Sequence, residues 1–333
     1  MIPFSILDLA PIRQGADVAQ AYQVMRRQAQ RAEELGYHRY WLAEHHNMAG
    51  IGSTATSVLI GHVAEATHTI RVGSGGIMLP NPPPLVIAEQ FGTLETLYPG
   101  RIDLGLGRAP GTDQLTARAL RRERIGADHD FPRDVLELQA YFDASAADRP
   151  VRAIPGAGLQ IPIWLLGSSL FSAGLASQLG LPYAFAAHFA PADLLNALTV
   201  YRGDFQPSAQ LQQPHAMIGI NVVAADTDQE ARRLFTSMQM QSVDMARGRR
   251  EPLPAPIDDI QAYWTPQEQA AVEHKLACSF VGSADTLTRS LASFIEQTGA
   301  DELIANVRIH APEAALHCLE ILAQVRDRLA QPA

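Results

Sequence analysis

The sequence predicts an α/β fold, a (β/α)8 TIM barrel with insertions, and three observations support this fold class. Eight strand-like segments alternate with helix-like segments along the chain, which is the number that a TIM barrel needs. The length of 333 residues suits a barrel of about 250 residues that carries insertions. Hydrophobic residues make up 47% of the chain and charged residues 18%, as in globular proteins with a large core.

The predicted strands are short apolar runs, as expected of parallel strands that are buried on both faces. They cover residues 3–9, 37–44, 69–76, 101–107, 163–166, 183–188, 216–225 and 302–309. Helices are predicted at residues 17–35, 53–66, 85–97, 132–142, 171–179, 192–201, 228–247, 285–298 and 312–329. The first helix shows clear boundary signals, with a capping residue at Asp17 and a stop at Gly36.

A single domain is predicted for residues 1–333, with insertion regions near residues 113–160 and 248–280. The second region contains the segment 251–256, whose three prolines remove hydrogen-bond donors, and we interpret it as a loop excursion or a lid. An open doubly wound sheet is the alternative fold, because such a sheet needs only roughly five or six strands and two weak strands could merge.

The composition also limits the possible partners and the compartment. The formal net charge of −9 disfavours nucleic acid as a partner, because proteins that bind nucleic acid usually carry a basic surface. Cys278 and Cys318 lie far apart and give no disulfide framework, and the first residues show no signal-peptide pattern, so we expect a cytoplasmic protein. The segment 161–192 lacks Asp, Glu, Lys and Arg, but glycine and proline divide it, so no membrane span is predicted.

A buried strand ends in polar side chains within residues 40–47, which read Tyr-Trp-Leu-Ala-Glu-His-His-Asn. Ligands bind at the carboxyl ends of parallel strands in α/β folds, so Glu44 and His45 are candidate catalytic residues. A solvated turn after a strand is the alternative explanation. A metal site is not predicted, since neighbouring side chains point in different directions and the helical spacing of metalloprotease histidines is absent.

Two glycine-containing strand ends are further candidates for ligand binding. Residues 105–111 match a dinucleotide-binding loop poorly, because a proline occupies the place of the third glycine. Arg108 in this loop is instead a candidate cation for a phosphate group. Gly75 and Gly76 end another strand, where paired glycines either let the backbone approach a flat ring or form a simple turn.

A strand also turns into a helix at residues 166–172, where Gly167, Ser168, Ser169 and Ser172 gather at one helix start. Unpaired backbone N–H groups at a helix start, together with serine hydroxyls, suit the binding of an anion. Capping of the helix by Ser168 or Ser169 is the alternative explanation. Because the strand ends of a barrel meet on one face, we expect all of these candidates to lie together.

Several of these segments carry a resemblance to a known family. They are residues 41–47 (Trp-Leu-Ala-Glu-His-His-Asn), 72–80 (Val-Gly-Ser-Gly-Gly-Ile-Met-Leu-Pro), 100–108 (Gly-Arg-Ile-Asp-Leu-Gly-Leu-Gly-Arg) and 280–283 (Phe-Val-Gly-Ser). With them the chain resembles the bacterial-luciferase-like flavin monooxygenase family over nearly its whole length. Residues 7–11 extend the resemblance to an enterobacterial branch of that family.

The resemblance implies an FMN-binding TIM barrel, usually a homodimer, that receives reduced FMN from a separate flavin reductase. The reduced FMN would react with O₂, and one oxygen atom would pass to a small organic substrate. His45 would contribute hydrogen bonding or proton transfer, with an imidazole pKa near neutrality, and Glu44 would orient that imidazole.

The same resemblance implies roles for the remaining candidates. Gly75 and Gly76 would form a non-proline cis peptide against the flavin ring. The flavin phosphate would be bound by Arg108, Gly167, Ser168, Ser169 and Ser172.

Two positions depart from luciferase, which has a glutamate in place of Ser168 and a cysteine in place of Gly107. Neither aldehyde chemistry nor light emission is therefore expected. Two other functions stay open. An F420-dependent hydride-transfer oxidoreductase of the same superfamily would need an open basic groove for the polyglutamate tail of F420, whereas the serine loop here is uncharged. A non-catalytic flavin-binding protein would have no need of His45.

Overall fold

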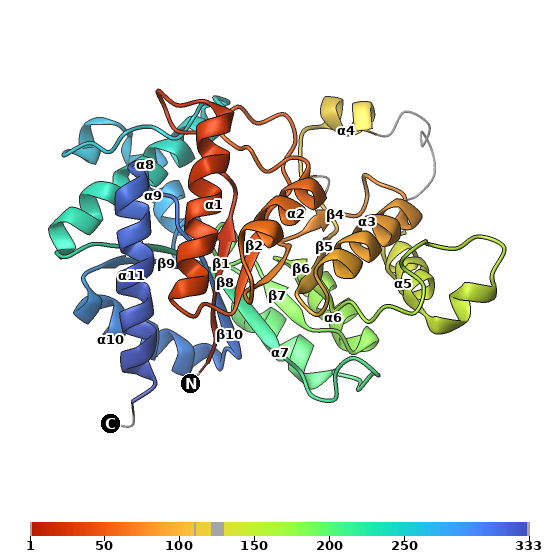
Figure 1. The fold of residues 1–333 in the computed structure, drawn as a ribbon. Helices are drawn as coiled ribbons and strands as arrows, with labels where there is room; N and C mark the ends of the chain where they lie inside the picture. Colours follow the sequence, from red (N-terminus) through yellow and green to blue (C-terminus); the bar gives the residue numbers. More distant parts are fainter. Residues whose placement is uncertain (1, 110, 121–129, 332–333) are drawn as a thin grey trace.

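The computed structural model describes residues 2–109, 111–120 and 130–331, and these form a closed β-barrel surrounded by helices (Figure 1). The barrel strands are β1 (Phe4–Asp8), β2 (Arg39–Leu42), β3 (Arg71–Ser74), β5 (Ile102–Gly107), β6 (Ile163–Gly167), β7 (Tyr183–Phe185), β8 (Ala216–Ala224) and β10 (Glu302–Asn306). They follow one another around the barrel in this order, each parallel to the next, and β8 pairs with β10 to close the ring. The predicted TIM barrel is therefore confirmed, and the open-sheet alternative is wrong.

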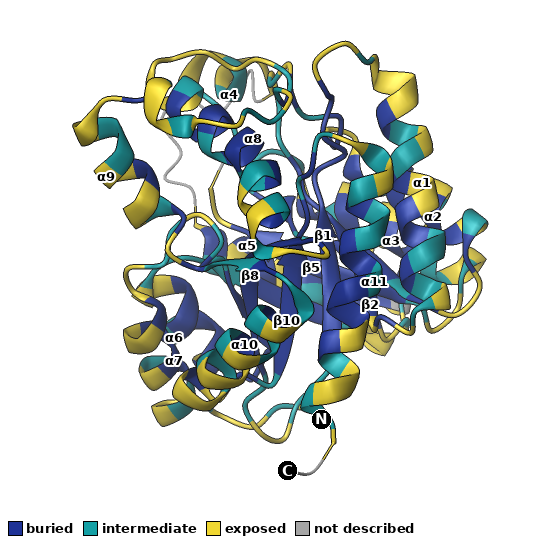
Figure 2. Cartoon of the chain, turned by 90° about the vertical axis from the view of Figure 1, so that its left-hand side faces the viewer, coloured by how far each residue is buried: buried dark blue, intermediate teal, exposed yellow. Residues whose placement is uncertain are grey.

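Helices cover the outside of the barrel, so that the strands are buried while the outer helix faces are exposed (Figure 2). The helices that follow barrel strands directly are α1 (Val18–Glu34), α2 (Thr56–Ala66), α6 (Leu170–Leu179), α7 (Leu194–Gly203), α8 (Asp228–Ala246) and α11 (Pro312–Leu329). Two more pack beside them, α3 (Pro84–Leu97) and α5 (Phe131–Phe142), and α10 (Ala284–Thr298) precedes β10. Asp17 caps α1 as predicted, since its side chain accepts a hydrogen bond from the Gln20 backbone N–H.

Several short elements were not predicted from the sequence. Strand β4 (Ile77–Met78) pairs with β5, and β9 (Ser279–Gly282) pairs with the second half of β8. The helices α4 (Gln114–Leu120) and α9 (Pro266–Lys275) and the 3₁₀ helices η1 (Ala144–Asp148) and η2 (Ile260–Ala262) were also missed. These four helices, unlike β4 and most of β9, lie in the segments 113–160 and 248–280 where insertions are predicted, and residues 121–129 of the first segment fall outside the described residues.

Alternation along the strands divides their side chains between two hydrophobic clusters. The larger cluster fills the space between the barrel and the helices. A smaller one fills the barrel interior, with Leu7, Trp41, Trp164, Met217 and Ile304 among its members. The rings of Trp41 and Trp164 meet edge to face, with centroids 5.2 Å apart.

The amino-terminal end of the barrel is closed by buried ion pairs. Arg39 begins β2 and donates to Asp103 of β5 over 2.7 Å and to Glu302 of β10 over 3.1 Å. Arg71 begins β3 and reaches the same Asp103 over 2.7 Å. Both carboxylates are completely buried and both have arginine partners, so the charges at this end are compensated within the protein.

The proline-rich segment 251–256 is a loop, as predicted, and it is held at one point. The backbone N–H of Leu253 donates to the carbonyl of Ile12, and the N–H of Gln14 donates to the carbonyl of Leu253. Its role as a lid stays a prediction. None of the helices in the described part of the chain is both long and apolar enough to cross a lipid bilayer. Cys278 and Cys318 are both free and buried.

Candidate functional site

The candidate residues lie at the carboxyl end of the barrel, the upper end in Figure 1, where the connections that carry α4 and α8 also lie. The chain leaves the sheet earlier than predicted at β2, β7 and β10. The residues that follow these strands form the rim of the barrel instead of its wall. Every second side chain of a strand points into the barrel, and this alternation continues into the rim. Trp41 and Ala43 lie in the interior cluster, so His45, two residues after Ala43, is on the same side of the chain.

Glu44 does not orient His45, which corrects the expectation from the sequence. The Glu44 carboxylate lies 3.0 Å from Nε2 of His46, two residues along the chain. Side chains two apart in an extended segment point to the same side, whereas those of adjacent residues point to opposite sides. Glu44 is buried, and burial raises the pKa of its carboxyl group, while the hydrogen bond from His46 acts in the opposite direction.

His45 is held as a neutral imidazole rather than poised near neutrality. Loss of hydration lowers its pKa to about 4, and the positive charge of Arg308 contributes to the same shift. Its backbone N–H donates to the Ser53 carbonyl, but Nδ1 is shielded from water and has no hydrogen-bond partner in the described structure. A buried nitrogen without a partner is available for a bound molecule.

The peptide bond between Gly75 and Gly76 is cis, as the family resemblance implies. Side chains would not fit at either position. A Cβ atom at Gly75 would lie 2.6 Å from Cδ1 of Leu7, and one at Gly76 would lie 2.7 Å from the carbonyl oxygen of Gly105. The end of β3 therefore presents bare backbone at the rim of the barrel.

Arg108 reaches the start of α6, and its role in binding an anion stays a prediction. Strands β5 and β6 are neighbours, and Gly107 lies opposite Leu166. The Arg108 guanidinium lies over the ring of Phe171, 4.4 Å from its centroid, and Phe171 is in the first turn of α6. Arg108 is exposed and forms no ion pair within the described part of the chain, so its charge is free for a ligand.

The serines at this turn are used in different ways. Ser169 occupies the N-cap position of α6, but its side chain makes no capping hydrogen bond, so simple capping does not explain it. Ser172 is buried, and its hydroxyl donates to the Ser169 carbonyl and lies 3.3 Å from the Tyr183 hydroxyl. Any Cβ atom at Gly167 would collide with this Ser172 hydroxyl. Gly167 and Ser172 thus shape the turn, while Ser168 and Ser169 remain partly exposed at it.

The sequence analysis missed His188, Asn306 and Arg308, which also lie at this end. His188 follows β7, and burial lowers its pKa to about 3, with a contribution from Arg308. Its Nδ1, the Asn306 Oδ1 and the Arg308 Nε are buried without hydrogen-bond partners in the described structure. A signal was present for two of them, since Asn306 and Arg308 continue the inward-facing series of Ile304 at a spacing of two residues.

Segments from different parts of the chain are tied together over this end. The backbone N–H of His46 donates to the Gly111 carbonyl over 3.2 Å, and the Thr112 hydroxyl donates to the His46 carbonyl over 3.0 Å. Arg250, next to the proline-rich loop, forms an ion pair of 2.9 Å with Asp113. These contacts hold the loop after β2, the loop after β5 and the segment before the prolines together at the carboxyl end of the barrel.

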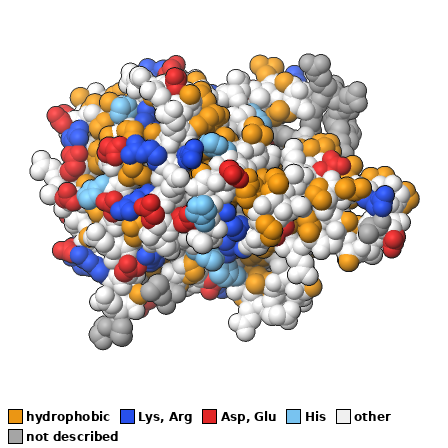
Figure 3. Space-filling view, viewed as in Figure 1, with side chains coloured by type: hydrophobic (Ala, Val, Ile, Leu, Met, Phe, Trp, Pro, Cys, Tyr) orange, Lys and Arg blue, Asp and Glu red, His pale blue; other side chains and the backbone are white. Residues whose placement is uncertain are grey.

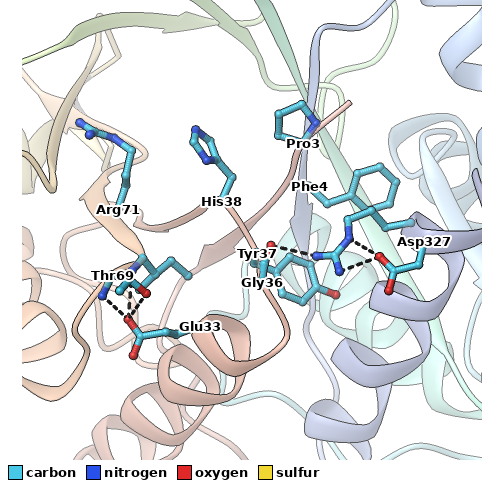
Figure 4. Close-up of a pocket in the computed structure, with 11 residues that line it drawn as sticks. Pro3, Phe4, Glu33, Gly36, Tyr37, His38, Thr69, Arg71 and Asp327 are labelled. Atoms are coloured by element: carbon cyan, nitrogen blue, oxygen red, sulfur yellow. Dashed lines mark hydrogen bonds and ion pairs between the residues drawn. The ribbon is translucent and has the colours of Figure 1, made fainter. Parts of the chain in front are cut away.

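A hollow at the opposite end of the barrel differs in character (Figure 4). Its lining includes Glu33, Arg71, Arg326 and Asp327, and all four are engaged within the protein. Glu33 accepts backbone N–H bonds from residues 68–70, Arg71 pairs with Asp103, and Arg326 pairs with Asp327. No group of three or more possible metal ligands occurs among the described residues at either end.

Solved structures share the whole fold. The crystal structure of apo-MsnO8 matches with a TM-score of 0.91 and 34% identity, over 98% of this chain and 99% of that one. The oxygenating constituent of 3,6-diketocamphane monooxygenase from Pseudomonas putida, in complex with FMN, matches with a TM-score of 0.75 and 16% identity over 100% and 99% of the two chains. An F420-dependent secondary alcohol dehydrogenase with an F420–acetone adduct matches with a TM-score of 0.68 and 14% identity over 98% and 99%.

Sequence relatives give the family. The model of the luciferase-like monooxygenases matches residues 2–302. A luciferase-like monooxygenase of Escherichia coli strain K12 is 54% identical over 328 residues, which cover 98% of each chain. An N-acetyl-S-alkylcysteine monooxygenase of Bacillus subtilis strain 168 is 36% identical over 256 residues, which cover 75% of this chain and 76% of that protein. The chain therefore belongs to the luciferase-like monooxygenase family, and its enzyme class is that of a monooxygenase.

Proposed function

We propose that this protein is a two-component, FMN-dependent monooxygenase whose single barrel domain binds reduced FMN at the carboxyl end of the barrel and oxygenates a small organic substrate there. The observation that carries the proposal is the meeting of Arg108 with the uncapped start of α6, beside the cis peptide of Gly75 and Gly76. Together they offer one cation, free N–H groups and bare backbone, which are the features that a phosphate and a flat ring require.

The residues present fit FMN. The first N–H groups of α6 have no partners inside the helix, and the Ser169 side chain leaves them uncapped, so they can bind phosphate oxygens. Arg108 adds a charge-assisted contact from the neighbouring strand. Gly75 and Gly76 pack so closely against Leu7 and Gly105 that neither position has room for a Cβ atom, so the end of β3 offers a flat ring only backbone atoms. Reduced FMN, when bound, supplies the electrons that activate O₂.

The protein contributes orientation and the exclusion of water. We assign His45 the role of a neutral hydrogen-bonding group toward the reacting atoms, because its Nδ1 is unpaired and its pKa of about 4 keeps it uncharged at pH 7. Glu44 acts one step further away, since it holds His46 and thereby the loop that packs on residues 111–112. The loops joined by Arg250 and Asp113 shield this region from solvent.

The proposed partners are O₂, a small organic substrate and a flavin reductase that supplies the reduced FMN. One relative is named as a monooxygenase of N-acetyl-S-alkylcysteine, which supports a small organic substrate for this chain. We also propose a homodimer. Hydrophobic side chains gather over α2 and α3 in Figure 3, and Val58, Val86 and Leu97 of these helices are 70%, 37% and 62% exposed, which suits a second copy of the same face.

Titration with oxidised FMN, reduced FMN and F420 tests the cofactor assignment. We expect wild-type protein to bind FMN more tightly than F420, and Arg108→Ala to weaken FMN binding by about ten- to hundredfold, because one charge-assisted phosphate contact is lost. Arg328→Ala is the matched control, since Arg328 is a half-exposed arginine on α11 that pairs with Asp285. Equal FMN affinity in Arg108→Ala and wild-type protein would contradict the phosphate placement, and preferential binding of F420 would favour hydride transfer.

A further inference from the structure

Arg308 is a partly buried cation to which no residue in the described part of the chain supplies an anionic partner. It lies two residues beyond the end of β10, and its Nη1 donates to the neutral side-chain oxygen of Gln241 over 2.9 Å. Its Nε is buried with no hydrogen-bond partner in the described structure. No carboxylate of a described residue forms an ion pair with it, in contrast to Arg39 at the other end of the barrel, which has two.

The other titratable groups around Arg308 are bases as well. His45 and His188 both feel its positive charge, and so does Lys275 at the end of α9. Lys275 is partly buried and makes no ion pair with a described residue. Four basic side chains from four different segments are thus close enough for the charge of Arg308 to act on the other three, and loss of hydration lowers the pKa of each.

Such a cluster is costly unless a negative charge completes it, because a buried cation loses hydration without gaining an ion pair. Nη1 of Arg308 is occupied by Gln241, which leaves the edge formed by Nε and Nη2. Two parallel N–H groups of this kind match the two oxygens of a carboxylate. The nearby Asn306 Oδ1 and the Nδ1 atoms of His45 and His188 are also unpaired, so the same bound molecule has further polar contacts available.

We propose that Arg308 binds a carboxylate group of the substrate, so that this enzyme oxygenates small organic acids. The inference rests on the proposed function, because it places this carboxylate beside His45 at the mouth of the same barrel. Arg308 is a specificity residue that anchors one end of the substrate, while the atom to be oxygenated lies toward the cofactor.

The anion at Arg308 is distinct from the cofactor phosphate. The phosphate site belongs to β5 and β6, whereas Arg308 follows β10. Around the closed barrel, β10 is separated from β6 by β7 and β8 on one side, and from β5 by β1, β2 and β3 on the other. The two cationic sites therefore lie at different positions around the mouth of the barrel, so one can bind the cofactor and the other the substrate.

Calorimetric titration of the FMN-saturated protein with hexanoate and with hexanamide tests the proposal, because these probes differ in charge but hardly in shape. We expect wild-type protein to bind hexanoate at least about tenfold more tightly than hexanamide. Arg308→Gln is expected to remove this preference and to leave FMN affinity unchanged. Arg308→Lys keeps the charge but not the paired N–H groups, so part of the preference is expected to remain. Arg328→Gln is the control for the loss of one surface arginine.

The outcomes separate this proposal from the proposed function. A hexanoate preference that survives in Arg308→Gln, or one that is absent from folded wild-type protein, overturns the carboxylate site even if FMN binds as expected. A parallel loss of FMN and hexanoate binding in Arg308→Gln assigns the cation to the flavin and also overturns it. If FMN does not bind but the preference of the cofactor-free protein depends on Arg308, the acid site stands and the cofactor assignment fails. Circular dichroism and thermal melting check that each variant is folded.

Discussion

Each end of the barrel contains an arginine with at least one buried nitrogen atom, but the partners of the two arginines differ. At the amino-terminal end, Arg39 lies between the buried carboxylates of Asp103 and Glu302. At the carboxyl end, Arg308 has a neutral glutamine as its partner, and neutral His45 and His188 lie within reach of its charge. The protein itself supplies the carboxylates that balance Arg39, whereas no described residue supplies an anion to Arg308.

This difference indicates which end serves stability and which serves function. An arginine whose partners are supplied by the fold contributes to folding, and its removal leaves buried carboxylates uncompensated. An arginine without such partners weakens the folded state, and we infer that Arg308 is retained because a ligand supplies the missing charge. The hollow of Figure 4 illustrates the same distinction, because it is open at the surface but its charged residues are already paired.

The largest expected effect is on the stability of Arg39→Gln. The substitution takes the ion-pair partner from two buried carboxylates, and breaking a buried pair typically costs about 3 to 5 kcal/mol. We expect a decrease of this size in the free energy of unfolding, measured by denaturation in guanidinium chloride. The Arg27→Gln variant is the control, since Arg27 pairs with Glu313 on the surface. Equal stability of the two variants would contradict the view that the amino-terminal end is a structural centre.

The next effect concerns the reaction rather than stability. We expect His45→Ala to bind reduced FMN normally but to form product with at least about hundredfold lower yield per reduced FMN consumed, because a positioned hydrogen-bonding or acid–base group contributes that much. Stability is expected to change by no more than about 1 to 2 kcal/mol, since the side chain lies at a strand end. The measurement uses any substrate that the FMN-loaded protein oxygenates. A wild-type yield in His45→Ala would show that this residue is structural.

The compensated end and the barrel wall were easier to predict than the open end. Apolar runs fix a buried strand over its whole length, so all eight barrel strands were predicted from the sequence at nearly the right places. Strand β4 was missed because it has only two residues, which carry no readable period, and β9 was missed because it lies outside the alternation of strands and helices that builds the barrel. Element ends were also imprecise, because apolar residues such as Ala43, Ala187 and Val307 continue beyond the last paired residue of their strands.

Side-chain partners at the site could not be predicted in the same way. The motif at residues 40–47 identifies the strand end, but only the structure shows that Glu44 faces His46 and that His45 faces the interior. The sequence analysis expected a near-neutral pKa for His45 because it could not foresee the burial of this side chain. Nor could it foresee the charge of Arg308, which lies 263 positions later in the sequence. Charged residues that lie close together at the end of a barrel come from strands far apart in the sequence, so no local sequence pattern predicts their proximity.

A smaller effect is expected in the pH dependence of stability. The pKa of His188 is lowered to about 3 in the folded protein from 6.5. As the pH falls below 6.5, His188 becomes protonated in the unfolded chain but stays neutral in the folded protein. The stability that is present above pH 6.5 is therefore lost progressively as the pH approaches 3. We expect His188→Gln to lose less stability than wild-type protein between pH 7 and pH 5, by on the order of 1 to 2 kcal/mol. Carboxylates titrate in both proteins and cancel in the difference.

The urea unfolding of cofactor-free protein at the two pH values measures this difference. Equal losses in His188→Gln and wild-type protein would mean that His188 is hydrated in the folded state. The variant His68→Gln is the control. It also removes one histidine, but His68 is exposed, so no buried site changes.

The smallest expected effect is the most informative about the comparison. Arg308→Gln removes a buried cation and one hydrogen bond to Gln241, and the two changes act in opposite directions on stability. We therefore expect the free energy of unfolding of cofactor-free protein to change by less than about 1 kcal/mol, or to increase, while Arg39→Gln loses several times that amount. Denaturation in guanidinium chloride at pH 7 measures both variants under the same conditions. A loss in Arg308→Gln as large as that in Arg39→Gln would mean that the fold supplies a partner for Arg308 after all. A near-zero change, together with the loss of the preference for hexanoate, would identify Arg308 as a cation that the fold carries for its substrate.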